Sequence, residues 1–204
     1  ELLYYSYWLD EGAIAIAHLA KRVGSSAISR AHGWDVYPKR HPFKYLPFRR
    51  FLASSGIKVC PISMHGEEAL RAQGFTNLHL YYLGTPASKK METTDKPNTK
   101  TLVSISSIIE LKRVQRIAEI FLKLYQQDNT WRWHHFGDGP LEAGVKEWLD
   151  KSGAEGYSFH GRQSNETIHK WLSENTKNTI FINQSTTEGL PVSMMEAMSV
   201  GIPC

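Results

Sequence analysis

From Thr101 to the end of the chain, short runs of β-branched and aromatic residues alternate with longer segments of helical period. Ile117, Phe121 and Leu124 recur at the spacing of one helix face, and Val145 and Leu149 do the same. Strands separated by helices pair in parallel, so this half predicts a parallel α/β domain. We expect strands at 101–106, 131–136, 157–160 and 179–183, and helices ending near 125, 150 and 174, with another after 191.

The first half repeats this alternation, with expected strands at 2–7, 27–31 and 57–62 and helices at 13–21 and 46–53. Between the halves, residues 86–100 contain scarcely any apolar side chain, which is typical of an interdomain linker. We therefore expect a first domain over residues 1–90, a linker over 91–100 and a second domain over 101–204.

The composition is that of a globular protein, with 41% hydrophobic and 22% charged residues in 204. Two cysteines, Cys60 and Cys204, form neither a disulfide framework nor a spaced set of metal ligands, so we expect a reducing compartment and no zinc. No apolar run approaches the roughly 20 residues of a membrane span, and the opening has no signal-peptide core. Because the chain lacks an initiator methionine, and Gly201 to Cys204 resemble the exit from a helix into a strand, we interpret it as an internal fragment.

The net charge of +4 arises in the first half, where residues 1–95 contain 12 Lys and Arg against 8 Asp and Glu; residues 96–204 contain 12 of each. Basic and aromatic residues interleave in Pro38 to Phe51. One interpretation is that residues 39–51 contact anionic lipid headgroups and bring the protein to a lipid-linked acceptor. The other is a solvated helix with a packed aromatic face. No nucleic-acid motif accompanies the basic run, so we expect no nucleic-acid partner.

Two glutamates eight positions apart, Glu188 and Glu196, bracket a loop that turns into a helix. Pro191 suits the first turn of that helix, because its missing N–H costs nothing there. The unpaired N–H groups of a helix N-terminus and the positive end of its dipole favour an anion, and a diphosphate is a natural ligand. The pattern predicts a sugar-nucleotide site flanked by two acids. The alternative is an acidic residue that favours the helix dipole, followed by an exposed helical Glu.

Several segments, in this order, make the second half resemble the retaining family 4 glycosyltransferases of GT-B fold: Ser104 to Ser106 with Lys112, His135 to Pro140, Phe159 to Gly161, and Glu188 to Glu196 followed by Gly201 to Pro203. The first half is similar more loosely, through Arg30 to Asp35 and Val59 to Ser63. The resemblance implies an α/β fold of GT-B type, with two Rossmann-like domains built on parallel sheets, both incomplete in this chain. It also implies that the second domain binds most of the donor and the first binds the acceptor.

The resemblance assigns roles to individual residues. Glu188 would contact the donor sugar and Glu196 the ribose. The stretch between them, Gly189, Leu190, Pro191 and Val192, would bind the donor diphosphate. Lys112 matches a lysine that neutralises the departing diphosphate. Without the resemblance, a solvated lysine at a helix start is the favoured interpretation.

The family often has an arginine five positions before that lysine, where this chain has Ser107. Arg113 is a candidate to replace its charge, although neighbouring helical positions point in different directions. Gly137 follows a strand and is a candidate to line the nucleotide side of the site, or it belongs to a simple strand-to-helix turn. His32 lies in a His-Gly-x-Asp segment after a first-domain strand, where an α/β sheet presents residues to a ligand, and is a candidate to reach donor or acceptor.

We therefore expect a retaining, metal-independent, hexosyltransferase-like enzyme that moves a sugar from a UDP- or GDP-sugar to a saccharide or lipid-linked acceptor during cell-surface polysaccharide or glycolipid synthesis. By analogy the leaving phosphate receives the acceptor proton, and no Asp-x-Asp cluster is present to hold a metal. We expect no cofactor, a cytoplasmic location that extends to the inner face of the membrane, and little activity for this fragment alone. A noncatalytic nucleotide-sugar-binding homologue and a GT-B nucleotide-sugar epimerase remain alternatives. A dinucleotide-binding dehydrogenase is disfavoured because no Gly-x-Gly-x-x-Gly follows a strand.

Overall fold

The computed structural model describes residues 2–85, 99–188 and 190–204. The chain divides into two compact units, Glu1–Leu83 with Glu188–Leu190 and Gly84–Thr187 with Pro191–Cys204. The predicted linker, residues 91–100, lies outside the described residues except for its last two positions.

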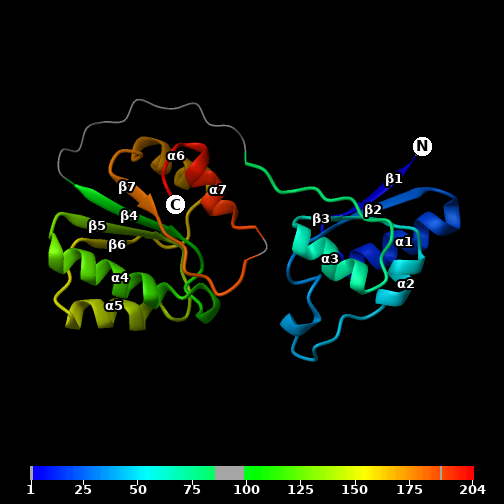
Figure 1. Cartoon of the computed structure of the whole chain (residues 1–204), viewed down its shortest axis with the longest axis horizontal. Helices are drawn as coiled ribbons and strands as arrows, with labels where there is room; N and C mark the ends of the chain where they lie inside the picture. The colour runs from blue at the N-terminus through cyan, green and yellow to red at the C-terminus, as the bar shows by residue number, and fades with distance from the viewer. Residues whose placement is uncertain (1, 86–98, 189) are drawn as a thin grey trace. The chain divides into compact units, whose positions relative to one another are not determined.

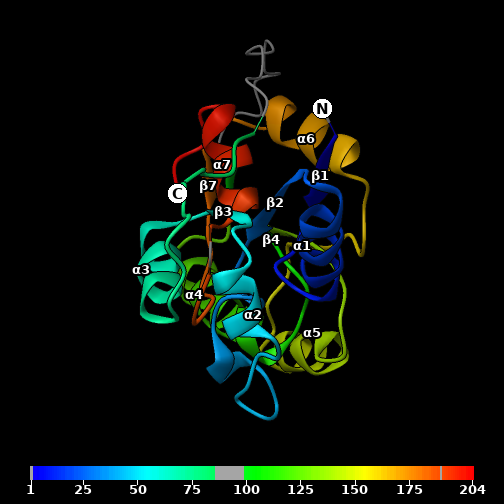
Figure 2. The same cartoon turned by 90° about the vertical axis from the view of Figure 1, so that its right-hand side faces the viewer.

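The first unit is built on a three-stranded parallel sheet in the order β1-β2-β3 (Figure 1). Its strands are β1 (Leu3–Ser6), β2 (Ser26–Ala31) and β3 (Lys58–Pro61), and its helices are α1 (Glu11–Val23), η1 (Pro38–Arg40), α2 (Arg49–Ser54) and α3 (Met64–Ala72). Helix α1 packs through three buried alanines, Ala13, Ala17 and Ala20, which allow it to approach the sheet closely. In both views α2 lies beside α1 (Figure 1, Figure 2).

The start of α2 differs from the prediction of a helix over 46–53. Phe48 has a left-handed backbone (φ 57°), and α2 therefore begins only at Arg49. Pro47 contributes, because the residue before a proline is disfavoured in the helical region. Helix α3, which the sequence analysis did not predict, begins after Ser63, whose hydroxyl accepts the Gly66 N–H at 3.1 Å as an N-cap.

The second unit contains a four-stranded parallel sheet in the order β6-β5-β4-β7. Its strands are β4 (Lys100–Ile105), β5 (Trp131–Phe136), β6 (Tyr157–Phe159) and β7 (Thr179–Phe181). Its helices are η2 (Glu110–Lys112), α4 (Val114–Gln127), α5 (Glu142–Lys151), α6 (Asn165–Glu174) and α7 (Val192–Ser199). Helices α4 and α5 cover one face of the sheet, and α6 and α7 cover the other (Figure 1).

Neighbouring residues of β4 show how the sheet divides its core. Leu102 packs with α4 and α5, whereas Val103 packs with α6 and α7, because successive side chains of a strand point to opposite faces. Each face of the sheet has large, fully buried side chains: Trp133 and Phe121 lie on one side, and Phe181 lies on the other. A sheet covered on both faces accounts for strands without polar alternation.

The predicted α/β class with parallel sheets is confirmed, and strand 131–136 is confirmed at both ends. Cys60 is buried and Cys204 is exposed, and both are free thiols. Across the described residues, every helix falls short of the length and apolar character needed to cross a bilayer.

Candidate functional site

Glu196 is the second acid of the predicted pair, and the structure buries it. Its exposed fraction is 8%, and its Oε1 accepts a hydrogen bond of 3.0 Å from Nδ2 of Asn165, the first residue of α6. The interpretation of Glu196 as an exposed helical glutamate is therefore wrong. A carboxylate is rarely buried at the surface end of a helix without a polar partner, and here a neighbouring helix supplies that partner.

Helix α7 begins directly after Pro191, as expected, but Pro191 precedes its first turn and does not belong to it. Pro191 is its N-cap, with ψ at 94°, and the helix begins at Val192. The first helical hydrogen bonds run from the N–H groups of Met194 and Met195 to the Pro191 carbonyl, at 3.1 and 3.2 Å. The N–H groups of Val192 and Ser193 precede them, in the turn where helix donors have no intrahelical acceptor. This turn has the geometry that favours an anion.

The ends of β4 and β5 are joined by a buried hydrogen-bond chain. The Trp133 Nε1–H donates to Ser104 Oγ at 2.9 Å. His135 Nε2 lies 3.1 Å from the Ser106 carbonyl, which can only accept, so Nε2 carries the ring proton and donates. Nδ1 of the neutral ring therefore accepts from the Ser104 hydroxyl at 2.8 Å. Burial lowers the pKa of His135 to about 4. His135 is therefore a neutral structural residue, and its hydrogen bond to the Ser106 carbonyl fixes the position of the loop after β4.

Gly137 and Gly139 bring their loop against the loop after β4. A Cβ on Gly137, whose φ is +129°, would lie 2.0 Å from the Ser106 carbonyl oxygen, and a Cβ on Gly139 would lie 2.4 Å from the Ile108 oxygen. The close approach that requires these glycines is thus to the chain's own backbone. Contact of Gly137 with a nucleotide stays a prediction.

Lys112 ends η2, and Arg113 follows in a left-handed conformation (φ 52°) as the N-cap of α4. Their loop is tied to the one after β7, because the Thr186 N–H donates to the Leu111 carbonyl at 3.0 Å. The sheet thus brings together the loop that carries Lys112 and the segment that leads towards Glu188.

The remaining residues of the predicted pair region are less informative. Glu188 and Leu190 are half-buried and lie outside any helix or strand, and Gly189 lies outside the described residues. Ser107, in the position where the family often has an arginine, is exposed. The donor contacts assigned to these positions stay predictions.

In the first unit, His32 is nine-tenths buried, and its ring packs against the rings of Tyr7 and Trp8 at centroid distances of 4.7 and 4.3 Å. Its backbone N–H donates to Asp35 Oδ1 at 2.6 Å, while Asp35 Oδ2 accepts the Leu9 N–H at 2.7 Å. Within the described ranges, both ring nitrogens of His32 are buried without a hydrogen-bond partner. Orphaned buried nitrogens are rare, and they favour a site for water or a ligand.

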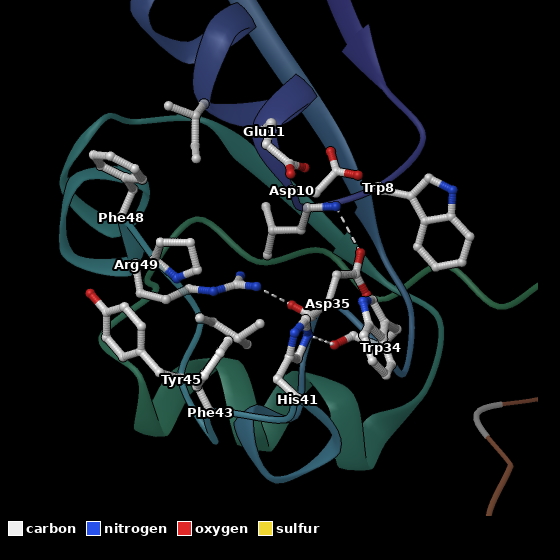
Figure 3. A pocket seen from close by; sticks show the side chains of 14 residues that line it. Trp8, Asp10, Glu11, Trp34, Asp35, His41, Phe43, Tyr45, Phe48 and Arg49 are labelled. Carbon is white, nitrogen blue, oxygen red and sulfur yellow. Dashed lines mark hydrogen bonds between the residues drawn. The ribbon is translucent and has the colours of Figure 1, made fainter.

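A cavity of about 610 Å³ opens beside this histidine segment, as Figure 3 shows. One side carries Asp10 and Glu11 at the start of α1, and the rest is largely aromatic, with Trp34 and Tyr45 among its lining residues. Arg49 extends into it and donates to the Asp35 carbonyl. Burial lowers the pKa of Arg49 to about 10, although the negative charges of Asp35 and Asp10 act to raise it.

The structure contradicts the interpretation of residues 39–51 as a helix with a packed aromatic face. Only residues 39 and 40, in the short η1, and residues 49–51, in α2, are helical, and Phe43, Tyr45 and Phe48 are exposed by 90%, 65% and 62%. Pro42 and Pro47 interrupt the helical pattern, so the aromatic side chains project from loops.

Sequence reasoning missed Asn165 and Arg49. Asn165 follows Ser164, the N-cap of α6, at the end of the loop after β6, so its place at the carboxyl edge of a parallel sheet is the signal that points to it. Arg49 lies in a basic run with nothing to distinguish it from its neighbours. No group of three or more His, Cys, Asp or Glu side chains in the described segments is placed to hold a metal ion.

Comparison with known proteins yields one family. The model of the family described as "Glycosyl transferases group 1" matches residues 87–204. The chain is 27% identical over 155 residues to a lipopolysaccharide 1,6-galactosyltransferase of Salmonella typhimurium, covering 74% of this chain and 40% of the relative. It is 27% identical over 187 residues to the amylovoran biosynthesis glycosyltransferase AmsK of Erwinia amylovora, covering 86% and 43%.

A solved structure with a similar fold is that of Anabaena HepE in complex with UDP-glucose. It superposes with a TM-score of 0.70 at 14% sequence identity, over 98% of this chain and 58% of that one. The chain spans about two fifths of the length of the curated relatives it matches.

Proposed function

Because the chain belongs to the glycosyl transferase group 1 family, we propose that the protein transfers a sugar from a nucleotide-diphosphate sugar to a hydroxyl acceptor. Its fold is α/β with parallel sheets, of GT-B type. The names of two relatives, which make lipopolysaccharide and amylovoran, support a role in polysaccharide or glycolipid synthesis. The UDP-glucose bound to HepE supports a UDP-sugar as donor, with a GDP-sugar as the alternative.

The observation that carries the proposal is the buried carboxylate of Glu196 one turn behind the N-terminus of α7. Its Asn165 contact holds Oε1 in place, so the carboxylate is preorganised to accept hydrogen bonds from a diol such as a ribose. The donor diphosphate is proposed to lie at the first turn of α7, near Leu190, Pro191 and Val192. Glu188 is proposed to contact the sugar.

The chemical step is proposed to retain the anomeric configuration. The leaving phosphate takes the proton of the acceptor hydroxyl on the face where the new bond forms, so no protein nucleophile is needed. Lys112 and Arg113 are proposed to stabilise the negative charge that grows on the diphosphate, and this makes a metal ion dispensable.

The acceptor is proposed to bind to the first unit. Aromatic faces such as those of Trp34 and Tyr45 suit the apolar face of a sugar ring, while Glu11 can accept bonds from its hydroxyls. His32, with two orphaned ring nitrogens, is proposed to bond a substrate hydroxyl. Replacing His32 by Ala should lower the catalytic rate, and an unaltered rate would remove that role. We propose a cytoplasmic location, which suits a chain whose two cysteines provide no disulfide framework.

The test incubates the full-length protein with UDP- and GDP-sugars and identifies the products. A transferase releases a free nucleoside diphosphate and forms a glycoside. An epimerase would return an altered nucleotide sugar, and a noncatalytic homologue would bind the donor without any product. Product formed at full rate in the presence of a chelator would support metal independence, and the anomeric coupling of the product by NMR would test retention.

Two variants test the site residues. Lys112→Ala should abolish most donor turnover without loss of folding, because it removes charge that matters only as the diphosphate departs. Glu196→Gln should weaken donor binding. Lys170→Ala and Glu166→Gln are matched controls on the exposed surface of α6. Unchanged turnover in Lys112→Ala would remove its proposed role.

A further inference from the structure

Two histidines, His134 in β5 and His160 directly after β6, meet on the face of the second sheet that α6 covers. His134 Nδ1 and His160 Nε2 lie 2.9 Å apart, and 13° separates the planes of the two rings. The nearly coplanar rings suit an N–H···N hydrogen bond, in which one nitrogen donates and the other accepts. We call these two residues the histidine pair.

Aromatic side chains pack around the histidine pair. The His160 ring stacks on Phe136 at a centroid distance of 4.4 Å, and Trp171 of α6 packs against His134 at 5.0 Å. Phe136 is buried, and both histidines are half-buried. Burial lowers the pKa of His160, because a charged ring loses hydration in these surroundings. The site therefore favours the uncharged form of His160.

His160 begins the loop that leads into α6, and Asn165 is the first residue of that helix, five positions later. The His160 carbonyl accepts a hydrogen bond from Gln163 Nε2 within this loop, at 2.7 Å. Asn165 in turn donates to the buried carboxylate of Glu196. The position of the amide that holds Glu196 thus depends on a loop that the histidine pair holds at its first residue.

The surrounding elements carry further titratable groups. They are Arg132 and His135 on β5, Tyr157 on β6, Asp138 and Arg162 in the loops, Glu166, His169, Lys170 and Glu174 on α6, and Glu196 on α7. All the carboxylates among them except that of Glu196 are exposed, and Glu196 bonds to Asn165. Burial, and not a neighbouring acid, shifts the pKa of His160.

Protonation changes the histidine pair in two distinct steps. With one added proton the contact survives, because a charged N–H donates to the neutral nitrogen of the other ring. With a second proton, two cationic N–H donors face each other at the 2.9 Å separation, and like charges so close repel strongly. The contact then opens. Two sites that interact this closely take up their protons at two separate apparent pKa values.

From this geometry we infer that His134 and His160 are positioning residues for the candidate donor site. Their contact fixes the loop before α6, so that Asn165 holds Glu196 in place, and acid opens the contact by protonating both rings. Donor binding should therefore weaken reversibly in mildly acidic solution. The effect on donor binding rests on the proposed function, whereas the opening of the contact does not.

The first experiment measures the Kd of UDP, and of GDP in parallel, for the full-length protein by calorimetry between about pH 5 and pH 7.5, the range in which histidines titrate. The Kd should rise about tenfold or more towards acid, which corresponds to one lost hydrogen bond to a charged group. His134→Asn places an amide near the Nδ1 position, where it can donate to neutral His160 and accept from the protonated ring. This variant should bind as the wild type does at neutral pH and lose the acid rise. His160→Gln, with its amide near the Nε2 position, should do the same.

The matched control is His18→Asn, which removes an exposed histidine of α1. Protonation of the terminal phosphate of the nucleotide affects every variant alike, so the comparison isolates the histidine pair. A second experiment needs no nucleotide. In NMR spectra of protein with labelled histidines, the two rings should titrate in two steps more than about one pH unit apart, and His160 should titrate in a single step in His134→Asn.

A two-step titration, together with an acid rise in Kd that both amide variants remove and the control keeps, supports the inference. Three results overturn it: rings that titrate independently, an acid rise that His134→Asn and His160→Gln leave unchanged, or an equal loss of the rise in His18→Asn. If neither UDP nor GDP binds at any pH, the proposed donor site fails and the positioning role falls with it. A two-step titration would in that case still identify the coupled pair, so the two failures are distinguishable.

Discussion

The contact between Asn165 and Glu196 allows the candidate donor site to be tested through a residue that is not itself proposed to contact the donor. Asn165→Ala removes the amide that bonds Glu196 Oε1 at 3.0 Å. A hydrogen bond to a charged group is worth about 1.5–3 kcal/mol, and water replaces it poorly because Glu196 is 8% exposed. We therefore expect the free energy of unfolding to fall by about 1.5–3 kcal/mol at neutral pH. The N-cap of α6 is unaffected, since Ser164 provides it.

A double-mutant cycle of Asn165→Ala and Glu196→Ala, followed by urea denaturation, isolates the coupling. If the two side chains interact as described, the double variant should lose less free energy of unfolding than the two single variants lose in sum, by more than about 1 kcal/mol. The same proteins should show a raised KM for donor with a smaller change in kcat, because the proposed contact of Glu196 with the ribose would act equally in ground and transition states. Losses that add to within about 0.5 kcal/mol, or an unchanged KM, would refute the reasoning.

Three further predictions concern the scaffold. The pKa of His135 is lowered from 6.5 to about 4, so between these pH values the unfolded chain binds a proton that the native state does not. The free energy of unfolding should therefore fall by up to about 3 kcal/mol as the pH drops from 6.5 to 4. His135→Asn should flatten this pH dependence, measured by urea denaturation at each pH. Ser104→Ala strands the Trp133 and His135 ring nitrogens and should lower stability by about 2–5 kcal/mol, whereas a loss below 1 kcal/mol would mean that the hydrogen-bond chain is not formed. Gly137→Ala should lower stability by more than about 2 kcal/mol, while Gly144→Ala, in α5 with nothing within 4 Å, should raise it by roughly 0.5–1 kcal/mol; thermal melts compare the two.

The sequence was most informative where local pattern and burial agree. Strand 131–136 and the helix face of Ile117 and Phe121 could be predicted because both contribute to the same buried core, where sequence period and apolar character coincide. Helix α3 was missed because Leu70 is its one large buried apolar residue, which leaves little period to detect. The start of α2 depends on the left-handed backbone of Phe48, which the helix propensities of the residues do not predict.

The candidate site was predictable in its residue types but not in their surroundings. The spacing of Glu188 and Glu196 pointed to a pair of acids, yet the burial of Glu196 follows from the position of α6, whose Asn165 is 31 residues away in the chain. The exposure of Phe43 could not be predicted either, because the run of aromatic and basic residues is also compatible with an amphipathic helix, and only the structure shows that it lies in a loop.

Two histidines show how the structure separates scaffold from site. His135 belongs to the segment that resembles a known family, but both of its ring nitrogens are bonded within the chain, and burial keeps it neutral. His135 therefore has no ring nitrogen left to form a hydrogen bond with a substrate. His32 is also nearly buried, yet neither ring nitrogen has a hydrogen-bond partner among the described residues, and Asp35 Oδ2 lies 3.9 Å from Nδ1. Because leaving a buried polar group unpaired costs about 1–3 kcal/mol, such a residue persists where something else bonds it. The missing side chain of Gly137 makes room for the Ser106 carbonyl, and this close approach alone accounts for a glycine there, while contact with a nucleotide stays a prediction. Substrate contacts are therefore to be sought at His32 and Glu196 before the glycines and histidine of the 135–140 segment.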